Sequence, residues 1–134
     1  MKLEIHDLGP ESGIRCDLEH ILALLAPDSL NASWVVSDGY ESIETTGLSY
    51  GILESLAATG ERISGTVLMA IARKTTQIIW GDFTGYLPAD TGLGRPWIVL
   101  RAFDNSFWEM ETSDQKTFRH IEMICEDIRN ISIS

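Results

Sequence analysis

Three segments in the C-terminal half of the chain decide the fold that the sequence predicts. Residues 75–86 read TTQIIWGDFTGY, residues 97–103 read WIVLRAF, and residues 107–112 read FWEMET. Alternating side chains in the first and third segments, rich in aromatic and β-branched types, are typical of strands. The pair Asp104 and Asn105 suits a tight turn between the last two. The sequence therefore predicts a three-stranded antiparallel meander.

Shorter patterns near the N-terminus predict further strands. Residues 1–8, MKLEIHDL, alternate polar and apolar side chains, and residues 34–36 read WVV. Asp38 and Gly39 form a dipeptide suited to positive φ in a tight turn. We therefore expect residues 40–45 to return antiparallel to residues 34–36.

Apolar residues at helical spacing predict helices between these strands and after them. The spacing occurs over residues 17–27, 48–59 and 113–128, and the first and last of these begin with Asp and Ser, which cap helices. Residues 62–74 fit either a helix capped by Ser64 or a strand. Elements in this order predict one α+β domain over residues 1–134. Its antiparallel sheet joins the C-terminal meander to the N-terminal strands and carries helices on one face.

The charge balance limits the classes of partner. The chain has 134 residues, with 20 Asp and Glu against 10 Lys and Arg, which gives a formal net charge of −10. Nucleic-acid binding needs a basic surface, so no nucleic-acid partner is expected. The apolar stretches are too short to span a membrane, and the charged N-terminus does not resemble a signal peptide. Cys16 and Cys125 form no framework and are expected in the core, which favours a cytoplasmic protein.

Two motifs in the sequence suggest chemistry, one a hydrolase nucleophile and the other a metal site. Residues 47–51, GLSYG, match the G-x-S-x-G pattern of a hydrolase nucleophile, but the preceding segment is polar rather than a buried strand. Ser49 is therefore expected to cap the helix that follows. Cys16 and His20 have a spacing that places two metal ligands on one helical face, whereas zinc needs three or four. We expect no catalytic residue, no metal and no cofactor.

Aromatic and acidic side chains are interleaved within the meander. If alternation leaves some rings on the face that the helices do not cover, they form an exposed patch rimmed by carboxylates. Such a patch suits a basic protein partner, because charge steers the encounter and rings anchor the contact. The candidate contact residues are Trp80, Asp82, Tyr86, Asp90, Asp104, Trp108, Glu109 and Glu111.

One stretch of sequence carries a resemblance to known proteins. Residues 64–72 read SGTVLMAIA, residues 77–86 read QIIWGDFTGY, and residues 96–102 read PWIVLRA, followed by the turn before Phe107. This stretch resembles a group of small uncharacterised bacterial cytosolic proteins. The resemblance implies an α+β fold and a bacterial origin, and it implies no catalytic residue. More loosely, the size, acidity and lack of catalytic motifs are similar to immunity proteins of toxin systems.

Three functions follow in order of preference. The first is a non-catalytic protein-binding module, most concretely an immunity-type inhibitor of a basic partner such as a toxin. The second is a self-associating accessory domain, a homodimer formed through an exposed sheet face or edge. The third is a small hydrolase that uses Ser49.

Overall fold

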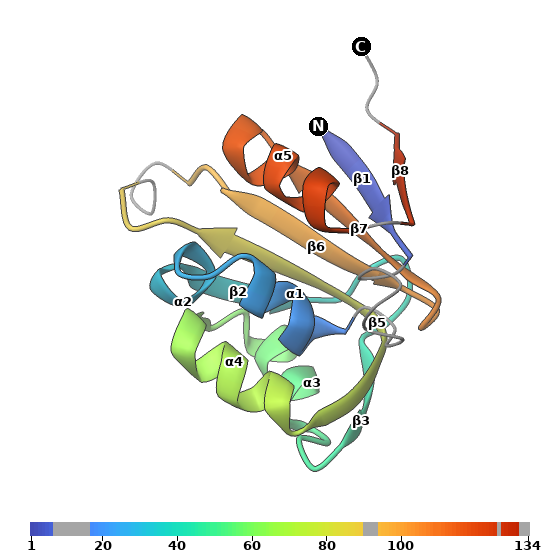
Figure 1. Cartoon of the computed structure of the whole chain (residues 1–134). Coiled ribbons are helices and arrows are strands. Elements are labelled where there is room, and N and C mark those ends of the chain that lie inside the picture. Colours follow the sequence, from blue (N-terminus) through green and yellow to red (C-terminus); the bar gives the residue numbers. More distant parts are fainter. Residues whose placement is uncertain (7–16, 90–93, 126, 132–134) are drawn as a thin grey trace.

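The protein folds as an antiparallel sheet with helices on one side (Figure 1). The computed structural model describes residues 1–6, 17–89, 94–125 and 127–131. The elements in chain order are β1 (Lys2–Ile5), α1 (Leu18–Leu24), α2 (Asp28–Asn31), β2 (Ser33–Ser37), β3 (Glu44–Gly47), α3 (Ile52–Thr59), β4 (Arg62–Ser64), α4 (Gly65–Arg73), β5 (Thr75–Tyr86), β6 (Ile98–Phe103), β7 (Phe107–Thr112), α5 (Gln115–Ile124) and β8 (Ile128–Asn130). The predicted α+β class is confirmed.

The eight strands of the described residues form a single sheet. Their order is β4-β2-β5-β6-β7-β1-β8, and β3 pairs with β5 as well. In Figure 1, α1, α2 and α4 lie in front of β2 and β5, while α5 lies in front of β6 and β7. The sheet therefore has one face covered by helices. We call the opposite face the open face.

The predicted meander forms the centre of this sheet. Strand β5 has the predicted bounds, β6 begins one residue later than predicted, and β7 has the predicted bounds. Asp104 and Asn105 both adopt positive φ, 50° and 55°, in the turn between β6 and β7. Asp and Asn tolerate this left-handed region better than other non-glycine residues, so the pair fixes the hairpin register.

The core lies between the sheet and the helices. Full burial of each large apolar side chain contributes about 1.5–3 kcal/mol. The sheet supplies the fully buried side chains of Leu3, Ile5, Trp34, Val36, Phe83, Ile98, Leu100 and Met110, and the helices supply Leu18, Ile21, Leu22, Leu53, Leu68 and Ile121. Trp34 lies over Gly85 of β5, where an added Cβ would come within 2.9 Å of the ring. Glycine at this position lets the indole lie flat against the strand.

One predicted strand pairing is wrong. Residues 40–45 do not return beside β2; the strand is β3, and it pairs with β5. The Asp38 carboxylate accepts a hydrogen bond from the Ile43 backbone N–H at 3.0 Å, which holds the chain in a wider loop. Strand β2 pairs only with the second half of β5, so the edge of the first half is free to accept β3.

Two predicted helix starts are also wrong. Helix α3 begins at Ile52 after Gly51, whose φ is 86°, and Ser49 is not its cap. Helix α5 is capped by Asp114 rather than Ser113, because the Asp114 carboxylate accepts a hydrogen bond from the Lys116 N–H. An aspartate one residue further along supplies the stronger, charged acceptor.

Of the remaining helix predictions, some are confirmed and others are wrong. Asp17 and Ser64 cap α1 and α4 as predicted. Residues 62–74 hold both alternatives in succession, since β4 is followed directly by α4. The C-terminal helix ends at Ile124, and Ile128 lies in β8, where it pairs with Ile5 of β1. The short helix α2 after Pro27 was not predicted.

Candidate functional site

Strand register brings aromatic side chains into one row on the open face. Trp80 of β5 is opposite Phe103 of β6, which is opposite Phe107 of β7. Their ring centroids are 6.2 Å and 5.1 Å apart, respectively. Tyr40 extends the row beyond Trp80 at 6.0 Å, and His6 extends it beyond Phe107 at 4.9 Å.

These five rings are the aromatic row. Trp80, Phe103, Phe107 and His6 are each half-buried, and Tyr40 is 82% exposed. Neighbours along the strands point the other way: Gly81, Ala102 and Trp108 are buried against the core. Because successive side chains in a strand alternate between faces, the row belongs to the face without helices. Partly accessible apolar groups that lie side by side on an uncovered sheet face, with polar residues around them, are typical of interaction sites.

A second row of the open face is charged. Asp82 is opposite Arg101, Arg101 is opposite Glu109, and Glu109 is opposite Glu4. The Arg101 guanidinium reaches three carboxylates, with Nε 3.5 Å from Asp82 Oδ2, Nη1 3.7 Å from Glu109 Oε1 and Nη2 3.0 Å from Glu111 Oε1. Arg101 therefore stands at the centre of a charge cluster.

Lys2 completes this charge cluster from the N-terminal strand. Its Nζ lies 3.6 Å from Glu109 Oε1 and 4.0 Å from Glu111 Oε2. The cluster thus sets two cations, Arg101 and Lys2, among three carboxylates. Two of the three carboxylate charges in the cluster are consequently balanced by Arg101 and Lys2, and partial burial strengthens the pairing of Arg101 with Asp82 and Glu109.

The protonation of Asp82 reflects this partial burial. Burial raises the pKa of the Asp82 carboxyl, the Arg101 guanidinium opposes the rise, and Glu109 adds to it. Arg101 Nη1 is itself buried and has no hydrogen-bond partner among the described residues. The cluster is packed as part of the sheet and is not a freely hydrated acidic face.

Exposed acids lie beside the aromatic row. Glu41 follows Tyr40, Glu44 is opposite Trp80 in the register of β3 and β5, and Asp104 follows Phe103. All three are exposed, and we call them the acidic rim. Sequence reasoning named Asp104 but missed Glu41 and Glu44, because their position depends on the pairing of β3 with β5.

The structure separates the sequence-predicted contact residues into four groups. Trp80 and Asp104 lie in or beside the aromatic row, and Asp82, Glu109 and Glu111 belong to the charge cluster. Tyr86 lies at the far end of β5, where the Arg62 guanidinium stacks 4.2 Å above its ring. Asp90 falls outside the described residues.

The structure corrects the prediction that Trp108 is an exposed contact residue. Its side chain is 4% exposed and packs against Phe83 in the core, with ring centroids 5.9 Å apart. The alternation that places Phe107 and Glu109 on the open face turns Trp108 toward the helices. Trp108 therefore contributes to stability and not to an exposed surface.

Among the described residues, the side chains of the hydrolase motif and of the suggested metal site have other hydrogen-bond partners. Ser49 is fully buried, and its hydroxyl shares a 2.5 Å hydrogen bond with Thr75 Oγ1 rather than with a histidine or carboxylate. His20 Nδ1 lies 2.6 Å from Asp17, and His120 Nε2 lies 3.0 Å from the Leu24 carbonyl. The part of the chain that the structure describes holds no group of three or more His, Cys, Asp and Glu suited to a metal ion. Cys125 is buried, and Cys16 falls outside the described residues.

Comparisons with family models, with curated proteins and with solved structures found no match to this chain. Along the described residues, none of the helices is both long enough and apolar enough to cross a membrane. The resemblance to small bacterial proteins and to immunity proteins stays a prediction.

Proposed function

We propose that the chain is a non-catalytic protein-binding module that docks a basic protein partner on the aromatic row. The observation that carries the proposal is the row itself, five rings in succession, each from a different segment of the chain. Aromatic side chains supply large contact areas at low entropic cost and dominate many interface hot spots. A surface of this kind recognises a partner and needs no reacting group.

The sign of the partner's charge follows from the acidic rim. The carboxylates of the charge cluster are already paired with Arg101 and Lys2, so they offer little field to an incoming protein. Glu41, Glu44 and Asp104 are exposed beside the rings, on a chain of net charge −10. They favour a basic partner, and opposite charges chiefly accelerate the encounter.

The proposed contact surface thus shifts from the one predicted from sequence. Trp80 and Asp104 remain contact residues, and Phe103, Phe107 and Tyr40 join them. Asp82, Glu109 and Glu111 act from within the sheet, where they position Arg101 and support the strands that carry the rings. This division makes the two sets of carboxylates experimentally separable.

More concretely, we propose an immunity-type inhibitor of a basic toxin in the bacterial cytoplasm. An inhibitor that works by covering another protein needs a folded domain and a surface complementary to its target, and the aromatic row with its acidic rim supports this function. The acidity of the chain suits a basic target.

The test begins with purification of the tagged chain from the cells that produce it, at low ionic strength, and identification of the bound protein by mass spectrometry. Binding to that purified protein is then measured for wild type and for a Glu44→Lys, Asp104→Lys double variant. Reversing two rim charges should weaken binding at least about tenfold, mainly through slower association.

A charge-matched control separates local contact from net charge. Asp28→Lys with Glu122→Lys changes two exposed acids away from the open face and alters the net charge equally. The control should bind as wild type does. A chain that elutes alone, or two double variants that bind equally, overturns the proposal.

The immunity function has its own readout. The identified protein is expressed in a bacterial host with the wild-type chain or with the Glu44→Lys, Asp104→Lys variant. Growth should be rescued by wild type only. A binding partner that is harmless when expressed alone would exclude the immunity function and leave protein binding in place.

A further inference from the structure

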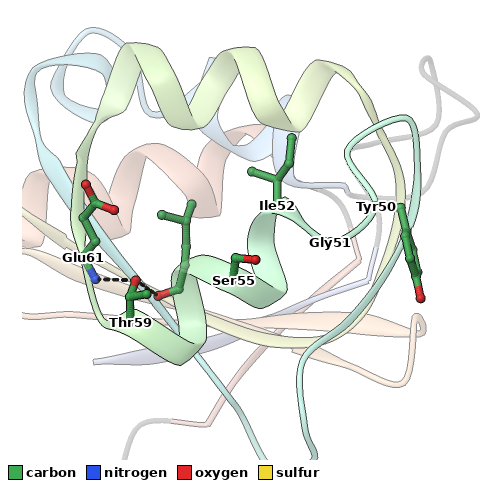
Figure 2. A pocket seen from close by; sticks show the side chains of 7 residues that line it. Tyr50, Gly51, Ile52, Ser55, Thr59 and Glu61 are labelled. Carbon is green, nitrogen blue, oxygen red and sulfur yellow. Dashed lines mark hydrogen bonds between the residues drawn. The ribbon is translucent and has the colours of Figure 1, made fainter.

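A second exposed apolar surface lies on α3 and the turn before it. Leu48 is 89% exposed, Tyr50 is 80% exposed and Ile52 is 43% exposed. Beside them lies a shallow hollow of about 340 Å³, lined by Tyr50, Ile52, Ser55, Leu56, Thr59 and Glu61 (Figure 2). We call Leu48, Tyr50 and the residues of α3 that line the hollow the α3 patch.

Helical spacing explains why this surface has no partner among the residues that the structure describes. Leu53 is fully buried in the core, and Leu56 and Ala57 pack partly against it. Ile52, Ser55 and Thr59 recur three and four residues apart and are all exposed, so they form a stripe away from Leu53. A stripe of this kind, with an apolar residue at its start and small residues after it, allows another helix to approach closely.

The charge of the patch indicates which occupant fits it. The acid within α3 is Glu54, and its carboxylate is turned away from solvent: Oε1 accepts a hydrogen bond from Thr45 Oγ1, and Oε2 is buried. The α3 patch is therefore uncharged apart from Glu61 at one end. Two copies of a chain with net charge −10 repel each other, and an uncharged surface is where that repulsion is smallest.

The patch also combines a projecting group with a hollow. Figure 2 shows Tyr50 pointing away from α3 at the end of the hollow opposite Thr59 and Glu61. A two-fold axis near Ser55 would run two α3 helices antiparallel and bring Tyr50 of each copy toward the Thr59 end of the other. Two-fold interfaces require such self-complementarity, in which one surface supplies both shapes.

We propose that the α3 patch is the contact between two copies of this chain in a homodimer. The proposal does not depend on the aromatic row, which stays accessible for the basic partner because it lies on the open face. The two associations also differ in their response to salt. Salt screens the repulsion between two acidic copies and strengthens the dimer, whereas it screens the attraction of the acidic rim for a basic partner and weakens that complex.

Sedimentation velocity over a range of protein concentrations and at two ionic strengths tests the dimer. Wild type should shift toward the dimer as concentration rises, and more so at high ionic strength. Ile52→Lys places a charge in the contact and should raise the dimer dissociation constant at least about tenfold. Because this variant is less negative overall, a loss of dimer cannot come from greater net-charge repulsion between the copies.

Met123→Lys is the matched control, since Met123 is 87% exposed on α5 and the change in net charge is the same. It should dimerise as wild type does, and Glu44→Lys should also leave the dimer intact. Circular dichroism confirms that each variant is folded. A wild type that is monomeric at every concentration and salt, or equal behaviour of Ile52→Lys and Met123→Lys, overturns the proposal. A monomer whose complex with a different protein is lost in Ile52→Lys assigns the patch to that protein and overturns it as well.

Discussion

At Gly65, the start of α4 lies in close contact with the backbone of α2. A Cβ added at Gly65 would lie 2.0 Å from the Ser29 carbonyl oxygen and 2.7 Å from Leu30 Cα, both of them backbone atoms. Gly65→Ala must push α2 and α4 apart, and we expect it to lower the free energy of unfolding by about 3 kcal/mol or more. Urea denaturation measures this loss.

Gly51→Ala gives the comparison for Gly65. An added Cβ at Gly51 meets no atom within 4 Å, but the φ of 86° disfavours any side chain. Its cost should be about 1–2 kcal/mol, from backbone conformation alone. Gly65→Ala with a loss no larger than that of Gly51→Ala would contradict the packing of α2 against α4.

The raised pKa of Asp82 predicts an unusual pH dependence of the free energy of unfolding. Because burial raises its pKa, the folded state binds a proton at a higher pH than the unfolded state, whose carboxyl keeps the ordinary pKa of about 3.9. Stability from this group therefore increases as the pH falls from the raised pKa toward the ordinary value. Asp82→Asn removes the buried charge, so it should be at least as stable as wild type at pH 7.

The measurement is urea unfolding of both chains at pH 7 and in mild acid. The advantage of Asp82→Asn over wild type should shrink in acid, since protonated Asp82 resembles asparagine. Exposed Asp104→Asn serves as the control, because it removes one carboxylate that lies outside the charge cluster. An advantage that grows in acid would mean that pairing with Arg101 outweighs burial at Asp82.

Some strands can be predicted from the sequence pattern of their own residues, and others cannot. Strands β5 to β7 were predicted to within a residue because each is long, alternates clearly and is joined to the next by a loop or turn with its own signature. Strand β3 and strand β8 are short, and their pairing depends on which sheet edge is left free. An edge is a property of the assembled sheet, so the sequence of residues 44–47 or 128–130 contains no local signal for it.

The N-terminus of α5 offers a direct test at this scale. Asp114 accepts hydrogen bonds from the Lys116 N–H at 3.1 Å and from the Thr117 hydroxyl at 2.7 Å, and Thr117 accepts one from Trp97 Nε1 at 3.2 Å. Asp114→Ala should therefore lower the free energy of unfolding by about 1–2 kcal/mol. Exposed Ser113, the cap expected from sequence, should tolerate alanine at almost no cost. Thermal unfolding of the two variants side by side decides between the two caps, and a larger loss for Ser113→Ala would reverse the assignment.

For the whole molecule, the sequence indicated the strands that carry the aromatic row but not the division of charge on them. Trp80 and Asp104 were predicted as contact residues because aromatics and acids are interleaved in the meander. Arg101 is the one charged residue in the otherwise apolar residues 97–103. Its place opposite both Asp82 and Glu109 follows from the register of three strands, and that register converts a predicted acidic surface into an internally paired cluster.

The two faces of the sheet predict a simple fluorescence behaviour. Trp34, Trp97 and Trp108 are each 5% exposed or less, whereas Trp80 is half-buried on the open face. Acrylamide, a neutral quencher that the net charge does not repel, should therefore quench mainly Trp80, and Trp80→Phe should remove most of the quenching. A partner docked on the aromatic row should protect Trp80, while dimerisation through α3 should not. Protection that appears with rising concentration of the chain alone, in place of a partner, would instead make the aromatic row the contact between copies.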